Sequence, residues 1–172
     1  MAIEVFKNIF RFIFLLGLQI LVLNKIQLSV YLNPFLYVLF ILSLPIETPK
    51  GLVLILSFIT GLVMDMFGDT LGMHTTACLF MGLLRPGMIK LISPREGFEF
   101  YFKPTIQYLG LPKYLVYAGV LVFVHHFVLF FIEYFRFSEL IYMFIKIFAS
   151  SAFTLILIFI SQQFFSRGKS NP

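Results

Sequence analysis

Small and ionisable residues that recur every four positions in two apolar runs are the first candidates for chemistry or close packing. They are Ser57, Gly61 and Asp65 in one run and His74, Cys78 and Gly82 in the next. Four-residue spacing places each set on one face of a helix, and small residues on such a face let two membrane helices approach closely. We therefore expect the two stripes to face each other, with Asp65 and His74 joined near the outer end by an ion pair or hydrogen bond.

The turn between these runs, MDMFGDTLGMH, holds Asp65, Asp69 and Gly72 in a segment too apolar for an ordinary solvated loop. Acids at membrane depth cost several kcal/mol unless they are paired. Two interpretations stay open at this stage. The turn closes a packed helix pair and satisfies its acids internally, or it is a contact site for another membrane protein.

A second polar set lies nearer the C-terminus. Two stripes make it up: Gly119, His126 and Glu133 at seven-residue spacing, and Lys146, Ser150 and Thr154 in the last apolar run. Because the connection between the two runs is short, Glu133 or Glu139 can reach Lys146 and form an internal ion pair. The alternative is a proton pathway through His125, His126 and Glu133, which requires further ionisable groups towards the cytoplasm.

Sequence patterns typical of catalysis are absent. The chain has no Gly-rich phosphate loop, no HExxH motif and no paired carboxylates around a nucleophile. His125 and His126 are adjacent and therefore point about 100° apart on a helix, so they cannot bind one metal ion together. Cys78 is the single cysteine, which excludes an internal disulfide and a cysteine-cluster metal site. We expect no enzymatic activity, no cofactor and no metal.

The elements that position these residues must be embedded in lipid. Hydrophobic residues make up 60% of the 172 positions, mean hydropathy is +0.97 and charged residues are only 12%. A soluble domain carries about 25% charged residues. We therefore expect an all-α integral membrane protein with a single domain and membrane lipids as partners. The net charge of +5 is interpreted as topology information, not as a sign of nucleic-acid binding.

About six transmembrane helices are expected from the apolar runs. The spans lie near residues 9–23, 34–46, 51–67, 73–92, 114–135 and 140–165. A spanning helix needs about 20 apolar residues, so the second run is short. It lies between Pro34 and Pro45, and it either begins upstream near Leu28 or forms a half-buried helix. The first run lacks a cleavage site and is expected to be an uncleaved span.

The distribution of basic residues predicts the orientation. With six spans, ten Lys and Arg residues, counted to include those at helix ends such as Arg85, fall on the side of both termini. Only Lys25 and Arg136 fall on the other side, so both termini are expected in the cytoplasm. The cytoplasmic connection 93–113 alternates charges with aromatic residues. We expect it to lie on the inner leaflet, with a docking surface as the alternative.

The stretch GLVMDMFGDTLGMHTTACLFMGLLRP, residues 61–86, resembles the signature region of the rod shape-determining protein MreD family. That family shows Gly-Leu-x-x-Asp at the end of one span, a short turn with Leu-Gly, and then a span rich in small residues. The matching positions here are Gly61, Leu62, Asp65, Leu71 and Gly72. Chain length, the six expected spans and a cytoplasmic N-terminus are similar too.

The resemblance implies a non-catalytic scaffold of the bacterial cell-wall elongation complex, located in the inner (cytoplasmic) membrane and affecting cell shape and peptidoglycan synthesis. Its implied partners are an MreC-like single-span protein and, directly or indirectly, a RodA-type glycosyltransferase, its transpeptidase and the MreB cytoskeleton. It implies no role for His125, His126, Lys146 or residues 93–113. The alternative is the substrate-binding membrane subunit of an energy-coupling-factor vitamin transporter, whose general shape is similar.

Overall fold

Five long helices carry the fold in the computed structural model, which describes residues 2–26, 32–94, 103–134 and 140–167. They are α1 (Ala2–Leu21), α3 (Lys50–Gly68), α4 (Met73–Ile92), α6 (Leu111–Glu133) and α7 (Leu140–Arg167). Each is long and apolar enough to cross a membrane. Helices are the expected form, because a lipid-embedded backbone must satisfy its own hydrogen bonds. The chain is therefore a multi-pass membrane protein.

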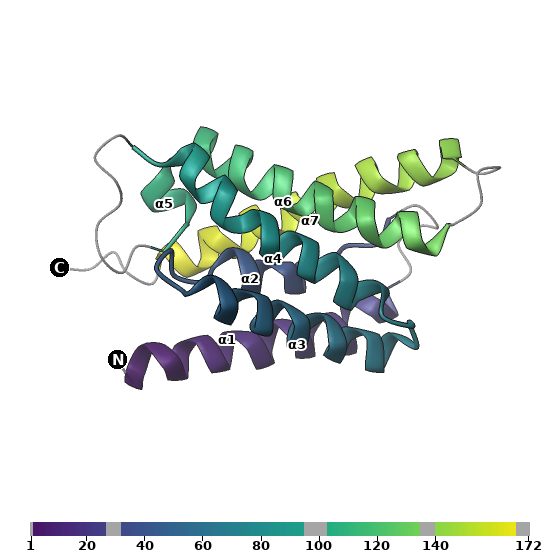
Figure 1. The fold of residues 1–172 in the computed structure, drawn as a ribbon, viewed down its shortest axis with the longest axis horizontal. Helices are drawn as coiled ribbons and strands as arrows, with labels where there is room; N and C mark the ends of the chain where they lie inside the picture. The colour runs from purple at the N-terminus through teal and green to yellow at the C-terminus, as the bar shows by residue number, and fades with distance from the viewer. Residues whose placement is uncertain (1, 27–31, 95–102, 135–139, 168–172) are drawn as a thin grey trace.

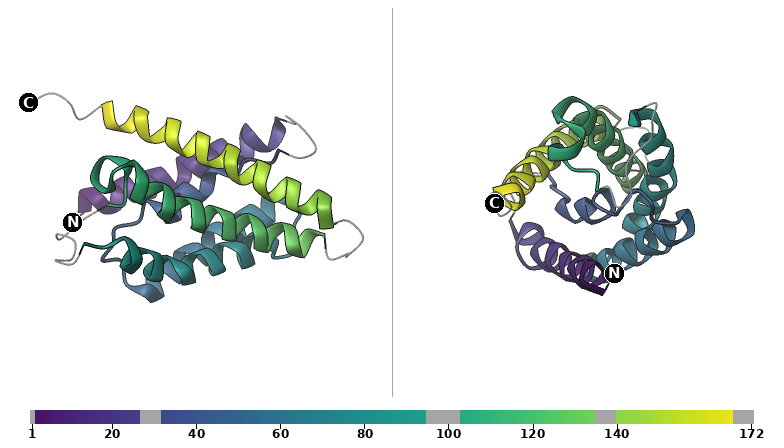
Figure 2. Two further views of the ribbon diagram at one scale, coloured as in Figure 1. Left: turned by 90° about the horizontal axis from the view of Figure 1, so that it is seen from above. Right: turned by 90° about the vertical axis from the view of Figure 1, so that its left-hand side faces the viewer.

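The long helices surround a short central element, as the end-on view in Figure 2 shows. The most extensive contacts join α3 to α4, α4 to α6, and α6 to α7, while α1 lies against α3 and the central element. The beginning of α1 and the end of α7 lie at the same end of the bundle (Figure 1). Which side of the membrane that end faces stays a prediction from the basic residues.

The expected second span, 34–46, is not a long helix. Its residues form an extended stretch up to Phe35, a 3-10 turn η2 (Leu36–Val38) and the single-turn helix α2 (Leu39–Leu42). α1 ends at one end of the bundle and α3 begins at the other (Figure 1). The chain must therefore cross back through residues 33–45, which we call the inner segment. A short helix suffices because an extended residue advances about 3.3 Å, against about 1.5 Å in a helix.

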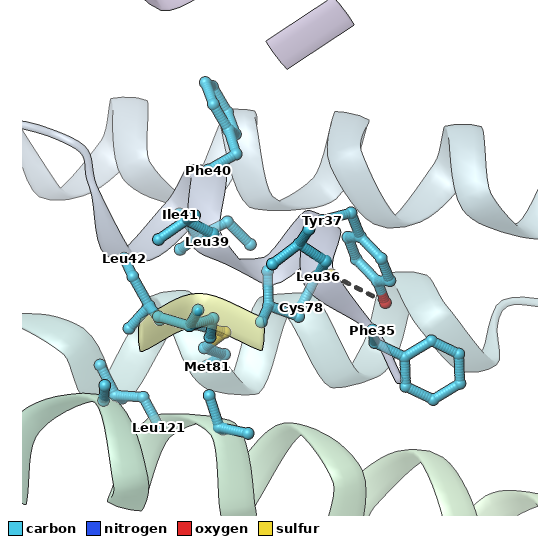
Figure 3. Close-up of a cluster of buried hydrophobic side chains, with 14 of the residues drawn as sticks. Phe35, Leu36, Tyr37, Leu39, Phe40, Ile41, Leu42, Cys78, Met81 and Leu121 are labelled. Carbon is cyan, nitrogen blue, oxygen red and sulfur yellow. Dashed lines mark hydrogen bonds between the residues drawn. The ribbon is translucent and has the colours of Figure 1, made fainter. Parts of the chain in front are cut away.

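The inner segment fills the centre of the bundle. The side chains of residues 35–44 are all buried. Figure 3 shows Leu36, Ile41 and Leu42 near Cys78 and Met81 of α4 and Leu121 of α6. Only residues 36–42 are helical, and non-helical residues on either side complete the crossing. The segment therefore crosses the bundle without the full-length helix that a spanning segment was expected to form.

The other expected boundaries differ from the structure by a few residues at most helix ends. α1 begins at Ala2, seven residues before the expected start of the first span. The expected connection 93–113 contains a short helix, α5 (Ile106–Leu109), and ends early because α6 begins at Leu111. The Gln162 side chain of α7 accepts a hydrogen bond from the Ile106 amide at 2.9 Å, which fixes α5 against α7. Residues 95–102 of this connection, and the tail after Arg167, lie outside the described residues.

Candidate functional site

The two small-residue stripes face each other across the α3–α4 contact, as their spacing predicted. A Cβ atom built on Gly82 would lie 3.1 Å from Cβ of Ser57. A Cβ atom built on Gly61 would lie 2.6 Å from the His74 carbonyl oxygen and 2.7 Å from the Thr75 amide nitrogen. Cys78, between these two contacts, is fully buried. Both stripes therefore pack against each other within this hairpin, and there is no room for a side chain at Gly61.

Asp65 closes the hairpin by capping the next helix. Its Oδ1 accepts hydrogen bonds from the Thr70 hydroxyl (2.6 Å) and the His74 amide (3.0 Å). Its Oδ2 accepts from the amide (2.9 Å) and the hydroxyl (2.5 Å) of Thr75. These amides are among the first N–H groups of α4, which have no partner within the helix. A carboxylate is also favoured at the positive end of the helix dipole.

The expected meeting of Asp65 and His74 therefore takes place, but through the backbone of His74. The hydrogen bond is the one between Asp65 Oδ1 and the His74 amide. The His74 ring is hydrogen-bonded to Tyr37 instead. Sequence spacing could bring the two residues together, but it could not tell which atoms of His74 would meet the carboxylate.

The turn after Asp65 is tightly held and displays apolar side chains. Asp69 has a left-handed backbone (φ 51°), as does Gly72 (φ 80°). The amides of Asp69 and Thr70 both donate to the Asp65 carbonyl oxygen. Leu71 is fully exposed. Met66 and Phe67, at 71% and 65% exposure, lie just before it, so this end of the hairpin presents an apolar surface on a fixed backbone.

A second polar group of side chains lies around the inner segment, at the centre of the bundle. The Tyr37 hydroxyl is 2.8 Å from His74 Nδ1 and 2.7 Å from His125 Nε2. His126 turns away from this group. Its Nδ1 lies 2.8 Å from the Val122 carbonyl oxygen and its Nε2 lies 3.2 Å from the Thr154 hydroxyl. The two adjacent histidines thus have different partners, consistent with their angular separation on α6.

Side chains from α1 and α7 satisfy the extended backbone of the inner segment. Gln19 of α1 accepts from the Leu36 amide (2.8 Å) and donates to the Pro34 carbonyl (2.9 Å). On α7, the Ser150 hydroxyl accepts from the Asn33 amide and the Thr154 hydroxyl from the Phe35 amide, each at 3.0 Å. Backbone outside a helix is tolerated at membrane depth only where protein groups satisfy it. These contacts explain the polar stripe of α7.

Arg85 holds the other end of the inner segment, and sequence reasoning missed it. Its guanidinium donates to the Tyr117 hydroxyl (3.0 Å) and to the carbonyls of Leu44 and Pro45. Tyr117 in turn donates to the Leu42 carbonyl at 2.9 Å. Arg85 is only 1% exposed, so its charge is held inside the protein and not in a loop or tail. Its place seven residues before the end of the apolar run, at Ile92, was the available signal for a buried role.

The expected ion pair between α6 and α7 is confirmed. Lys146 Nζ lies 2.9 Å from Glu133 Oε1 and 3.3 Å from the Tyr134 hydroxyl. It also lies 4.6 Å from the ring centroid of Phe130. Glu139, the other expected partner, lies outside the described residues. Glu133 is engaged with Lys146, while the hydrogen bonds of His125 and His126 lead to Tyr37, Val122 and Thr154, so the contacts do not join the three into the alternative proton pathway.

The arrangement thus offers two features. The turn between α3 and α4 exposes apolar side chains that a partner could cover, and buried hydrogen bonds hold the inner segment in place. Among the described residues, no three His, Cys, Asp or Glu side chains are grouped so that they could hold a metal ion. Comparison of the chain with protein families, curated proteins and solved structures finds no match.

Proposed function

We propose that this chain is a non-catalytic membrane scaffold of bacterial cell-wall elongation, located in the cytoplasmic membrane. The proposal rests on the resemblance of residues 61–86 to the MreD signature and on one structural observation. The residues of that signature build a hydrogen-bonded hairpin end, which exposes Leu71 and, shortly before it along the chain, Met66 and Phe67. In this proposal the hairpin end binds an MreC-like single-span protein. Through that protein or directly, the chain positions a RodA-type glycosyltransferase, its transpeptidase and the MreB cytoskeleton.

The displayed turn is suited to protein contact because its backbone is already ordered. Asp65 accepts four hydrogen bonds from the turn and the start of α4. A partner that covers Leu71 therefore loses little entropy in ordering the site. Burying a leucine side chain is worth about 1.5–3 kcal/mol. The lysine-poor surroundings of the turn also fit an apolar partner, such as the end of a transmembrane helix.

The small-residue stripe itself is not the docking face in this proposal. Ser57, Gly61 and Gly82 lie inside the α3–α4 contact, so a substitution there acts on folding. Docking must instead be tested at the exposed side chains of the turn. The inner segment argues against the transporter alternative. Its side chains occupy the centre of the bundle, where a bound vitamin would need space.

The first experiment is depletion of the protein in its rod-shaped host. The scaffold proposal expects rounding and lysis. A growth defect that added vitamin rescues would instead favour uptake and contradict the proposal.

The second experiment is complementation with Leu71→Ser, matched by Leu91→Ser. Leu91 is a strongly exposed leucine near the far end of α4, the helix that follows the turn holding Leu71. We expect Leu71→Ser to reach the membrane at normal levels, to lose co-purification of the MreC-like protein and to leave cells round. Leu91→Ser should restore rods. Equal co-purification by the two variants would contradict docking at this turn.

A further inference from the structure

Tyr37 occupies an unusual position, with its single hydroxyl group between two imidazole rings. His74 Nδ1 from α4 and His125 Nε2 from α6 lie within 2.8 Å of the Tyr37 oxygen. Tyr37 and His125 are fully buried, and His74 nearly so. Cys78 Sγ lies 3.9 Å from the same oxygen (Figure 3). The Tyr37–His74–His125 trio therefore joins the inner segment to the two helices that face it.

The hydrogen atoms of this trio can be placed by counting donors and acceptors. His125 Nδ1 is buried and has no hydrogen-bond partner in the described part of the chain. A bare ring nitrogen there costs less than an N–H group without an acceptor. His125 therefore carries its hydrogen on Nε2 and donates it to the Tyr37 oxygen. Tyr37 then donates its own hydrogen to Nδ1 of His74, and both short contacts are satisfied with neutral rings.

We propose that the trio is a proton-binding site, and that binding one further proton releases the inner segment from α4 and α6. A proton added to His74 Nδ1 removes the acceptor that Tyr37 needs. Tyr37 can then donate only to His125 Nε2, whose hydrogen must move to Nδ1, where nothing accepts it. A proton added directly to His125 leaves the same unpaired N–H group. Either way the closed arrangement carries a buried charge and an unpaired donor, and both are relieved when Tyr37 leaves and water enters.

The charged and titratable groups around the trio favour His74 as the site of proton entry. From α3, the Asp65 carboxylate lies against the His74 amide and attracts a positive charge on that ring. From α4, Cys78 contacts Tyr37. From α6, His126 lies beside His125, with ring centroids 5.4 Å apart, and disfavours a charge there. From α7, the side chain near this group is the neutral Thr154, and the Lys146 charge is paired with Glu133. From α1, the neutral Gln19 binds the inner segment.

Cys78 offers a direct readout of this release. It is the only cysteine in the chain and is fully buried beside Tyr37. A small maleimide can react with it only when this packing opens, by movement of the inner segment or by separation of α3 from α4. The measurement needs the purified full chain and no partner. It therefore fails or succeeds independently of the scaffold proposal.

The experiment compares the maleimide labelling rate of Cys78 at pH 7.5 and pH 5.5 in lipid nanodiscs. Each rate is divided by the rate for the same chain unfolded in dodecyl sulfate at the same pH, which removes the intrinsic pH dependence of the thiol. One proton linked to opening changes the opening equilibrium by up to about tenfold per pH unit. We expect the normalised rate to rise at least about tenfold at the lower pH. Tyr37→Phe should label rapidly at both pH values.

Matched histidine variants decide whether the trio is responsible. His74→Gln keeps a possible acceptor for Tyr37 but cannot take up a proton, so the pH response should be lost. His126→Gln, whose ring binds Val122 and Thr154 in the native chain, should keep the response. A flat normalised rate in the native chain overturns the proposal without any variant. A full response retained in both His74→Gln and His125→Gln overturns it as well.

Discussion

Replacing Gly61 with alanine adds one methyl group at the closest approach of α3 and α4. The new Cβ atom would lie 2.6 Å from the His74 carbonyl oxygen and 2.7 Å from the Thr75 amide nitrogen, and both are backbone atoms that cannot rotate away. The Thr75 Cα atom lies closer still, and an ordinary contact begins at 3.4 Å, so the start of α4 must retreat by about 1 Å. That retreat lengthens the hydrogen bonds from the His74 and Thr75 amides to the Asp65 carboxylate. They are now 3.0 and 2.9 Å long, and they would exceed the usual limit of about 3.2 Å.

Two costs follow from this retreat. Overpacking of this kind costs about 1–3 kcal/mol, and each weakened hydrogen bond to a charged group contributes up to about 1.5–3 kcal/mol. Partial relaxation reduces the total, and we expect Gly61→Ala to lower the free energy of unfolding by about 3 kcal/mol. For a chain of this size, that corresponds to a melting temperature about 6–12 °C lower.

Gly119→Ala is the matched control, since Gly119 also lies within a long helix but a Cβ atom there meets nothing within 4 Å. It should be neutral or stabilising by about 0.5–1 kcal/mol, because alanine favours the helix. Thermal unfolding in detergent can be followed with a fluorogenic maleimide that reacts as the buried Cys78 becomes accessible. Equal melting temperatures for the two variants would refute the close-packing argument.

Three further contacts are tested by substitution in the same thermal assay. Asp65→Asn leaves one acceptor oxygen in place of two and should lower the free energy of unfolding by about 2 kcal/mol or more. Asp69→Asn should be nearly neutral, because asparagine tolerates a left-handed backbone. Similar losses of stability in the two variants would argue against the capping role of Asp65. Arg85→Met should cost about 3 kcal/mol or more by leaving the carbonyls of the inner segment without their donor, and a native melting temperature would contradict that role. Glu133→Gln should destabilise more than the double variant Glu133→Gln/Lys146→Met, because only the single variant leaves a buried ammonium group without a carboxylate. The reverse order would show that Lys146 stabilises mainly through its contacts with Tyr134 and Phe130.

Much of the fold followed from residue patterns along the chain. Long apolar runs predicted the five long helices, because a lipid-embedded backbone has few other ways to satisfy its hydrogen bonds. Four-residue spacing predicted the facing of Gly61 and Gly82 towards the opposite helix, since that spacing is a property of the helix itself. The Lys146–Glu133 pair followed from the short distance between them along the chain.

The inner segment could not be predicted in the same way. A run of apolar residues bounded by Pro34 and Pro45 has the same appearance whether it forms a short spanning helix or a partly extended crossing. The choice depends on side chains far away in the sequence: Gln19, Ser150 and Thr154 supply the hydrogen bonds that an extended backbone needs. The sequence around the inner segment does not indicate that these distant side chains will lie beside it.

Residue types along the chain thus determined that this protein is embedded in lipid, where its long helices lie and that α3 and α4 pack closely, because these depend on local composition and helical periodicity. The tertiary structure decided that Asp65 caps α4 through backbone amides, that Arg85 is buried and that Tyr37 lies between His74 and His125. Other contacts reach further along the chain, since the Thr154 hydroxyl accepts from the Phe35 amide of the inner segment, 119 positions away. Their partners are selected by which groups remain unsatisfied once the helices have assembled, and that is settled only in three dimensions.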